Sequence, residues 1–131
     1  MLRFVKEIQG SRDSDNYSTP PDFYEELNKE FKFDFDPCPL KPTQDGLQVD
    51  WVGNIFINPP YSNIKAWVEK GLYEMERGTA KTLVYLLPCR TDTKYFHELI
   101  YHRAELRFVK GRLKFSGKAP APFPVYLAIF R

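Results

Sequence analysis

Residues 54–61 read Asn-Ile-Phe-Ile-Asn-Pro-Pro-Tyr, an apolar run that stops at two consecutive prolines. Proline has no N–H to donate and holds φ near about −65°, so Pro59 and Pro60 cannot continue a central strand. The pattern therefore predicts a buried strand over 54–57 that ends in a stiff loop. In open α/β sheets ligands bind at the carboxyl ends of the strands, which makes this loop the first candidate for a binding site.

The loop carries groups suited to a planar amine. The side-chain oxygen of Asn58 and the carbonyl of Pro59 can each accept one N–H of an NH2 group, while Tyr61 stacks on the attached ring. We expect the Asn58 amide to be exposed just past the strand. The alternative is purely structural, because Asn-Pro is also a common turn opener, and the four residues alone do not decide between the two.

Two other predicted strands end in polar loops. The alternating stretch 33–36 runs into Asp36-Pro37-Cys38, and the apolar stretch 82–87 runs into a loop that contains Arg90. Parallel strands bring such ends to one edge of the sheet, so Asp36 and Asn58 should lie close together.

The segment before the first strand predicts a helix start. Thr19 is expected as the N-cap, Pro20 as the first helical residue and Asp22 as its capping-box partner. The other reading of Thr19 is that its hydroxyl borders a ligand. A second helix is expected after the loop, through Ile64 and Met75 to a stop at Gly78, because its apolar residues keep helical spacing.

The C-terminal part predicts antiparallel closing strands over 104–109, 112–115 and 125–130. The expected fold class is therefore α/β, with a mostly parallel, doubly wound sheet of about five strands and an antiparallel C-terminal part. Residues 1–16 lack periodicity and are expected to form a flexible arm, which leaves 17–131 as one domain.

The composition of the 131 residues favours a globular protein, with 43% hydrophobic and 27% charged residues. No apolar segment approaches the roughly 20 residues of a membrane helix, and no signal peptide is evident, so we expect a cytoplasmic protein and no membrane partner. Cys38 and Cys89 lack metal-ligand spacing, and His97 and His102 are five residues apart, so no metal is expected.

The net charge of +2 is unevenly distributed. An acidic excess lies between Asp13 and Asp50, and six bases against one acid lie between Arg103 and Lys118. Such a basic strip is typical of a surface that binds a polyanion, although a solvated hairpin with incidental lysines would look the same. The candidate DNA contacts are Arg90, Arg112, Lys114 and Phe123, the last expected to be exposed in a proline-stiffened linker.

These motifs occur in an order that resembles the small phage-type DNA N6-adenine methyltransferases. The motifs are Tyr17-Ser18-Thr19-Pro20, Phe33-Asp34-Phe35-Asp36-Pro37-Cys38, Asp45-Gly46-Leu47, Asn58-Pro59-Pro60-Tyr61, Arg90-Thr91-Asp92-Thr93, Gly111-Arg112-Leu113 and Ala121-Pro122-Phe123-Pro124. The resemblance spans about residue 15 to the C-terminus. It implies a minimal Rossmann-like fold, S-adenosylmethionine as cofactor and DNA as substrate, in a bacterial host cell and encoded by the host, a phage or a prophage.

The resemblance also implies site residues. The catalytic set is Asn58, Pro59, Pro60 and Tyr61, with the target adenine flipped out of the duplex and stacked on the tyrosine. The cofactor set is Thr19, Pro20, Asp36, Pro37, Cys38, Asp45 and Asp50, in which Asp36 pairs with the cofactor's amino group and the last two contact its ribose. The family's glycine-rich cofactor loop is absent, because prolines follow Asp36.

Two alternatives remain open at this point. Protein-glutamine methyltransferases also carry Asn-Pro-Pro-Tyr, and the short interval between Asp36 and Asn54 also fits a non-catalytic nucleic-acid-binding remnant of the fold. The sequence gives neither the recognition site nor the oligomeric state.

Overall fold

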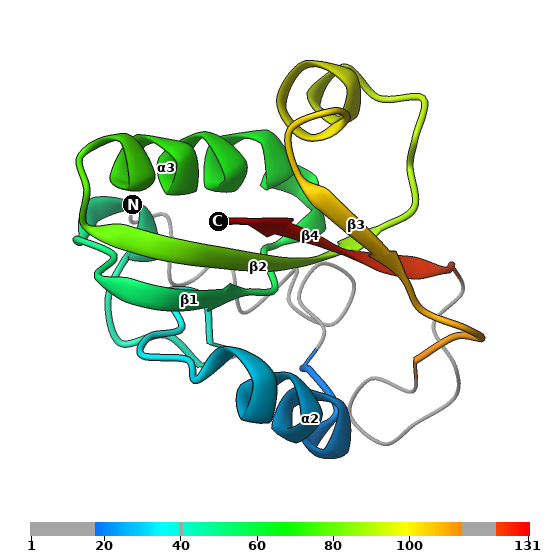
Figure 1. Ribbon diagram of the computed structural model, residues 1–131, viewed down its shortest axis with the longest axis horizontal. Helices are drawn as coiled ribbons and strands as arrows, with labels where there is room; N and C mark the ends of the chain where they lie inside the picture. Colours follow the sequence, from blue (N-terminus) through cyan, green and yellow to red (C-terminus); the bar gives the residue numbers. More distant parts are fainter. Residues whose placement is uncertain (1–17, 40, 114–122) are drawn as a thin grey trace.

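A computed structural model describes residues 18–39, 41–113 and 123–131, which form a mixed sheet with helices on both faces (Figure 1). The predicted arm, residues 1–16, and the candidate Lys114 lie outside the described residues. No helix in the described part of the chain is long and apolar enough to cross a membrane.

The sheet has four strands in the order β1-β2-β4-β3. They are β1 (Gly53–Ile57), β2 (Ala80–Pro88), β3 (Glu105–Phe108) and β4 (Val125–Phe130). The β1–β2 pair is parallel, whereas β4 pairs antiparallel with both β2 and β3. Three strands therefore run in one direction, and β4 is inserted between two of them in the reverse direction.

Two sequence-based expectations for the sheet are wrong. Of the predicted strand 33–36, only Phe35 forms a bridge, to Ile55, because the Asp34 carboxylate takes the N–H of Asn54 (2.8 Å) and Pro37 ends the segment. The predicted hairpin between 104–109 and 112–115 is not formed either, since β3 pairs with the distant β4 and residues 112–113 are not in a strand.

The helices divide between the two faces of the sheet (Figure 1). Helix α2 (Pro21–Phe31) covers one face through Leu27 and Phe31. Helix α3 (Ile64–Glu76) and the short π-helix η3 (Phe96–Ile100) cover the other face. Two 3-10 turns, η1 (Gly46–Gln48) and η2 (Tyr61–Asn63), precede β1 and α3.

The core consists of one apolar cluster on each face. Along β1, Ile55 and Ile57 pack toward α3, while Phe56 between them packs toward α2. A strand that is buried on both sides explains the continuous apolar run seen in the sequence. The same burial fixes the end of β1, and with it the position of the Asn58 loop.

Candidate functional site

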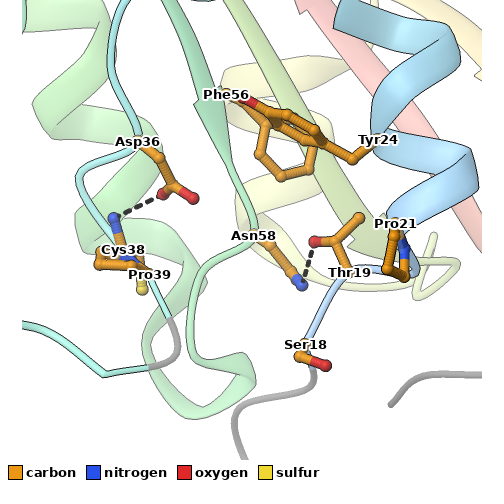
Figure 2. Close-up of a pocket in the computed structure, with 9 residues that line it drawn as sticks. All are labelled: Ser18, Thr19, Pro21, Tyr24, Asp36, Cys38, Pro39, Phe56 and Asn58. Atoms are coloured by element: carbon orange, nitrogen blue, oxygen red, sulfur yellow. Dashed lines mark hydrogen bonds between the residues drawn. The ribbon is translucent and has the colours of Figure 1, made fainter. Parts of the chain in front are cut away.

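A cavity of about 280 Å3 opens where the carboxyl end of β1 meets the start of α2 (Figure 2). Its size is close to the lower end of the range for small-molecule sites, roughly 300–1,000 Å3. The lining residues are Ser18, Thr19, Pro21, Tyr24, Asp36, Cys38, Pro39, Phe56 and Asn58. The structure therefore brings Asp36 and Asn58 together, as expected from the strand ends, and Thr19 and Cys38 line the same cavity, whereas Pro20 and Pro37 are not among the lining residues.

Asn58 forms the wall of the cavity at the end of β1. Only 8% of the residue is exposed, so the expected exposed amide is wrong: the start of α2 covers it. Its Nδ2 donates a hydrogen bond to Oγ1 of Thr19 at 3.1 Å (Figure 2). The amide is thus held by a residue 39 positions away in the chain.

Asp36 supplies the acidic group of the cavity. Its Oδ1 accepts the N–H of Cys38 (2.9 Å), which turns the chain at Pro37. Burial raises the pKa of the carboxyl to about 6, and the hydrogen bond from the Cys38 N–H offsets only part of this rise. Among the described residues no basic side chain pairs with it, so the cavity is suited to a ligand cation.

The apolar wall of the cavity is formed by Tyr24 and Phe56, whose rings meet edge to face with centroids 5.2 Å apart. Sequence reasoning assigned neither residue to the site. Tyr24 lies three residues before Leu27 on the inner side of α2, so its spacing indicates only that it faces the sheet. Phe56 was assigned to the buried strand, where it also belongs.

The loop after Asn58 is compact. Pro59 is buried, and the Pro60 carbonyl accepts the N–H of Asn63 (3.1 Å), which starts the turn of η2. Tyr61 is 9% exposed and packs edge to face with Phe123, their centroids 5.3 Å apart. The expectation that Phe123 is exposed is wrong, since it is half-buried against both clusters of the core.

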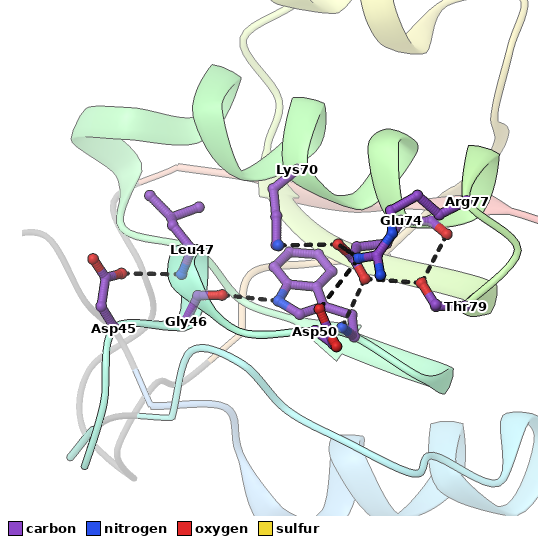
Figure 3. A network of polar contacts seen from close by, with 9 residues as sticks. Asp45, Gly46, Leu47, Asp50, Lys70, Glu74, Arg77 and Thr79 are labelled. Atoms are coloured by element: carbon purple, nitrogen blue, oxygen red, sulfur yellow. Dashed lines mark hydrogen bonds and ion pairs between the residues drawn. The ribbon is translucent and has the colours of Figure 1, made fainter.

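Asp45 and Asp50 do not line the cavity. Asp45 caps η1 by accepting the N–H of Leu47 (3.0 Å), and Asp50 pairs with Arg77 at 3.2 Å (Figure 3). The structure thus gives each of them a local partner instead of bringing them to Asp36.

A buried polar network supports the loop that carries Asp36 (Figure 3). Glu74 of α3 accepts the backbone N–H of Trp51 (3.0 Å), and the Trp51 indole donates to the carbonyl of Gly46 (2.8 Å). Gly46 in turn lies directly against the Pro37 carbonyl and the Trp67 ring, leaving no room for a side chain. The network therefore links α3 to Pro37, the residue next to Asp36, and holds it in position.

Two of the four candidate DNA contacts lie on the surface. Arg90 and Arg112 are exposed. By contrast, Arg107 of the basic strip is engaged, because it makes two 2.7 Å bonds to Glu30 and one of 2.9 Å to Glu105. The strip thus has fewer cations available for a polyanion than its sequence indicates.

A family model described as DNA N-6-adenine-methyltransferase (Dam) matches residues 8–122, which is most of the chain. The match favours DNA adenine over protein glutamine as the methyl acceptor, and an enzyme over a non-catalytic remnant. Comparison with curated proteins and with solved structures gives no match. Within the described residues, no three His, Cys, Asp or Glu side chains are grouped so that they could hold a metal ion.

Proposed function

Because the chain belongs to the DNA N-6-adenine-methyltransferase (Dam) family, whose members use S-adenosylmethionine, we propose that the cavity beside β1 binds this cofactor and that Asn58 holds the adenine amino group next to it. The observation that carries the proposal is that Asp36 and Asn58 line one cavity. The Asp36 carboxylate supplies a site for a cation, and the Asn58 side-chain oxygen supplies a hydrogen-bond acceptor for an amine.

The residues present fit the cofactor. A carboxylate without a basic partner among the described residues suits the ammonium of the methionine part, and the rings of Tyr24 and Phe56 suit its apolar atoms. Thr19 and Cys38 line the same cavity, and Pro20 and Pro37 adjoin its lining residues in the chain, so these four are proposed to complete the site. Asp45 and Asp50 belong to it only as candidate ribose contacts.

When bound, S-adenosylmethionine supplies an electrophilic methyl group on a positively charged sulfur. The residues of the protein position the amine that accepts the methyl group. The Asn58 side-chain oxygen and the Pro59 carbonyl accept the two N–H groups, which draws the nitrogen lone pair out of conjugation with the ring. Pro59 and Pro60 hold these acceptors in place, as such catalysis requires.

We assign the flipped base to the neighbourhood of Tyr61 and Phe123, since this aromatic pair follows directly from the Asn58 loop. We propose that the DNA phosphates are contacted by Arg90, Arg112 and Lys114. Contacts between cations and phosphates position a duplex on a protein without reading its sequence. Arg107 is left out of this surface because Glu30 and Glu105 already neutralise it.

The finer fold assignment is a minimal, doubly wound Rossmann-like domain over 17–131. Three strands in one direction, helices on both faces and a cavity at a carboxyl strand end support it, and we interpret the isolated bridge of Phe35 to Ile55 as the remnant of a fifth strand. DNA and S-adenosylmethionine meet in the bacterial cytoplasm, and we place the protein there, encoded by the host or by a phage or prophage.

The direct test is to incubate the protein with duplex DNA and methyl-labelled cofactor, and then digest the DNA to nucleosides. We expect label in N6-methyl-2′-deoxyadenosine and none in methylated deoxycytidine. Label that stays with protein instead of DNA would indicate a protein acceptor. Absence of label together with absence of cofactor binding would contradict the proposal.

The Asp36 carboxylate should make cofactor affinity depend on pH. The cation needs the ionised form, and the pKa of the carboxyl is about 6, so affinity should be full above pH 7 and fall as the pH drops through 6. Asp36→Asn should weaken binding by about tenfold or more at pH 7.5 and make it flat with pH. Calorimetric titrations from pH 5 to 8 measure both effects.

The same substitution should stabilise the protein without cofactor. The folded pKa of Asp36 lies above its unfolded value of 3.8, so its contribution to stability is present at low pH and lost as the pH rises through about 6. At pH 7.5 Asp36→Asn should therefore melt at a higher temperature than the wild type. A variant that melts lower yet binds the cofactor normally would remove Asp36 from the proposed site.

The surface cations should contribute through salt-dependent binding. The double variant Arg112→Ala/Lys114→Ala should weaken DNA binding regardless of sequence and reduce the slope of log affinity against log salt by about one unit for each lost phosphate contact. Lys81→Ala is the matched control, because Lys81 is an exposed base at the opposite end of the strands. Equal salt slopes in the double variant and the wild type would exclude these contacts.

A further inference from the structure

The Thr19 hydroxyl is not used as the sequence predicts. Helix α2 begins at Pro21 with Pro20 as its N-cap, and no side chain caps it. A threonine N-cap accepts the N–H of the residue two or three positions further on, and the residue two positions after Thr19 is Pro21, which has no N–H. The capping role expected for Thr19 is therefore wrong, and its oxygen is directed to Asn58 instead (Figure 2).

The hydrogen bond between Thr19 and Asn58 fixes the orientation of the Asn58 amide, so that its nitrogen and its oxygen face opposite sides. The χ2 torsion of an asparagine is broad and nearly two-fold, so the side-chain oxygen and nitrogen can exchange places at little cost. If the Asn58 side-chain nitrogen faced the adenine amino group, two hydrogen-bond donors would face each other and no hydrogen bond would form. Because Oγ1 of Thr19 accepts the N–H of Nδ2 at 3.1 Å, the nitrogen is held toward α2 and the oxygen is turned away from it.

From this geometry we propose that Thr19 is a positioning residue for methyl transfer, which orients the Asn58 amide so that its oxygen meets the adenine amino group. The inference rests on the proposed role of Asn58. It assigns Thr19 to the chemical step, and so differs from the expectation that Thr19 contacts the cofactor. It also makes the start of α2 a working part of the site, since Pro20 and Pro21 fix the chain that follows Thr19.

The two roles of Thr19 predict different kinetics. Thr19→Val keeps the shape of the side chain and removes the acceptor. A positioning role predicts that its single-turnover rate at saturating cofactor falls roughly tenfold, the value of about one hydrogen bond, while cofactor affinity and melting temperature change little. Thr19→Ser keeps the hydroxyl and should restore most of the rate. Thr82→Val, on strand β2, is the matched control for the loss of a threonine hydroxyl.

A double-mutant cycle completes the test. Thr19→Val should have no further effect in an Asn58→Ala background, because there is no amide left to orient. The proposal is overturned if Thr19→Val slows both backgrounds equally, if it weakens cofactor binding and leaves the saturated rate unchanged, if it changes neither, or if serine fails to restore the rate. Failure of the proposed function is seen separately, as an Asn58→Ala protein that still methylates at the wild-type rate.

Discussion

Replacement of Asn58 by alanine is expected to slow methyl transfer by roughly a hundred- to thousandfold, the usual effect of removing one preorganised contact to developing charge. The amide oxygen interacts most strongly when charge develops on the amine, so its loss raises the barrier more than it weakens binding. Cofactor affinity should change little, because the acidic group of the cavity is Asp36.

The burial of Asn58 adds a stability cost that the sequence does not indicate. With 8% of the residue exposed and a hydrogen bond to Thr19, the truncation should destabilise the fold by about 1–2 kcal/mol. Asn58→Asp should retain much of the activity, since a carboxylate accepts an N–H and the Thr19 hydroxyl can donate to it. The rate, the cofactor affinity and the melting temperature should therefore be measured on the same preparations.

Asn54→Ala is the matched control on the same strand. Asn54 donates to the carbonyls of Phe31 (2.8 Å) and Lys32 (3.3 Å) at the other end of β1, so the substitution also removes side-chain hydrogen bonds, one of them partly buried. It should lower the melting temperature and leave the single-turnover rate of the folded protein unchanged. A folded Asn58→Ala protein that methylates as fast as the Asn54→Ala protein would exclude the catalytic assignment.

Local patterns predicted the strands that the fold encloses completely. The run 125–130 coincides with β4, and 54–57 and 82–87 fall within β1 and β2, because burial on both faces leaves an unbroken apolar signal. The edge of the sheet was less predictable. The β3 partner depends on a chain segment about 20 residues further on, and the contacts of Arg107 with Glu30 that accompany this pairing leave no local pattern.

The site was predictable where strand ends determine it. Asp36 ends an alternating stretch and Asn58 follows an apolar one, and the parallel alignment of the two stretches brings both residues to one cavity. The aromatic wall was not predictable, because the helical spacing of Tyr24 is the same for a core residue and a cavity residue. Asp45 precedes a glycine, which is a typical turn position, and the structure shows it capping the turn η1.

Glu74 is a further residue whose burial the sequence only indirectly indicates. It lies three residues after Gly71 and seven after Trp67, on the side of α3 that faces the sheet, and it is fully buried. Lys70 of the same helix (3.0 Å) and Arg77 at its C-terminal cap (2.9 Å) neutralise it. A buried carboxylate of this kind is stable only while every partner is in place.

Glu74→Ala should destabilise the protein by about 3–5 kcal/mol, since it leaves the Trp51 N–H and Lys70 without their acceptor and Arg77 with Asp50 alone. Glu69→Ala is the matched control, an exposed glutamate on the same helix whose loss should change stability by no more than about 0.5 kcal/mol. Denaturant unfolding at pH 7 measures both. Equal midpoints for the two variants would mean that the network adds nothing to stability.

The Glu74 network should also determine how the protein responds to acid. Burial opposes ionisation of Glu74, but hydrogen bonds from Trp51, Lys70 and Thr79 and the charge of Lys70 outweigh it and lower the pKa to about 2. The folded pKa lies below the unfolded value of 4.5, so this stabilisation is complete above pH 4.5 and is lost as the pH falls toward 2. Glu74→Gln should be less stable than the wild type at pH 7, and the gap should narrow steadily below pH 4.5. A gap that stays constant down to pH 3 would show that the charge of Glu74 does not stabilise the loop beside Asp36.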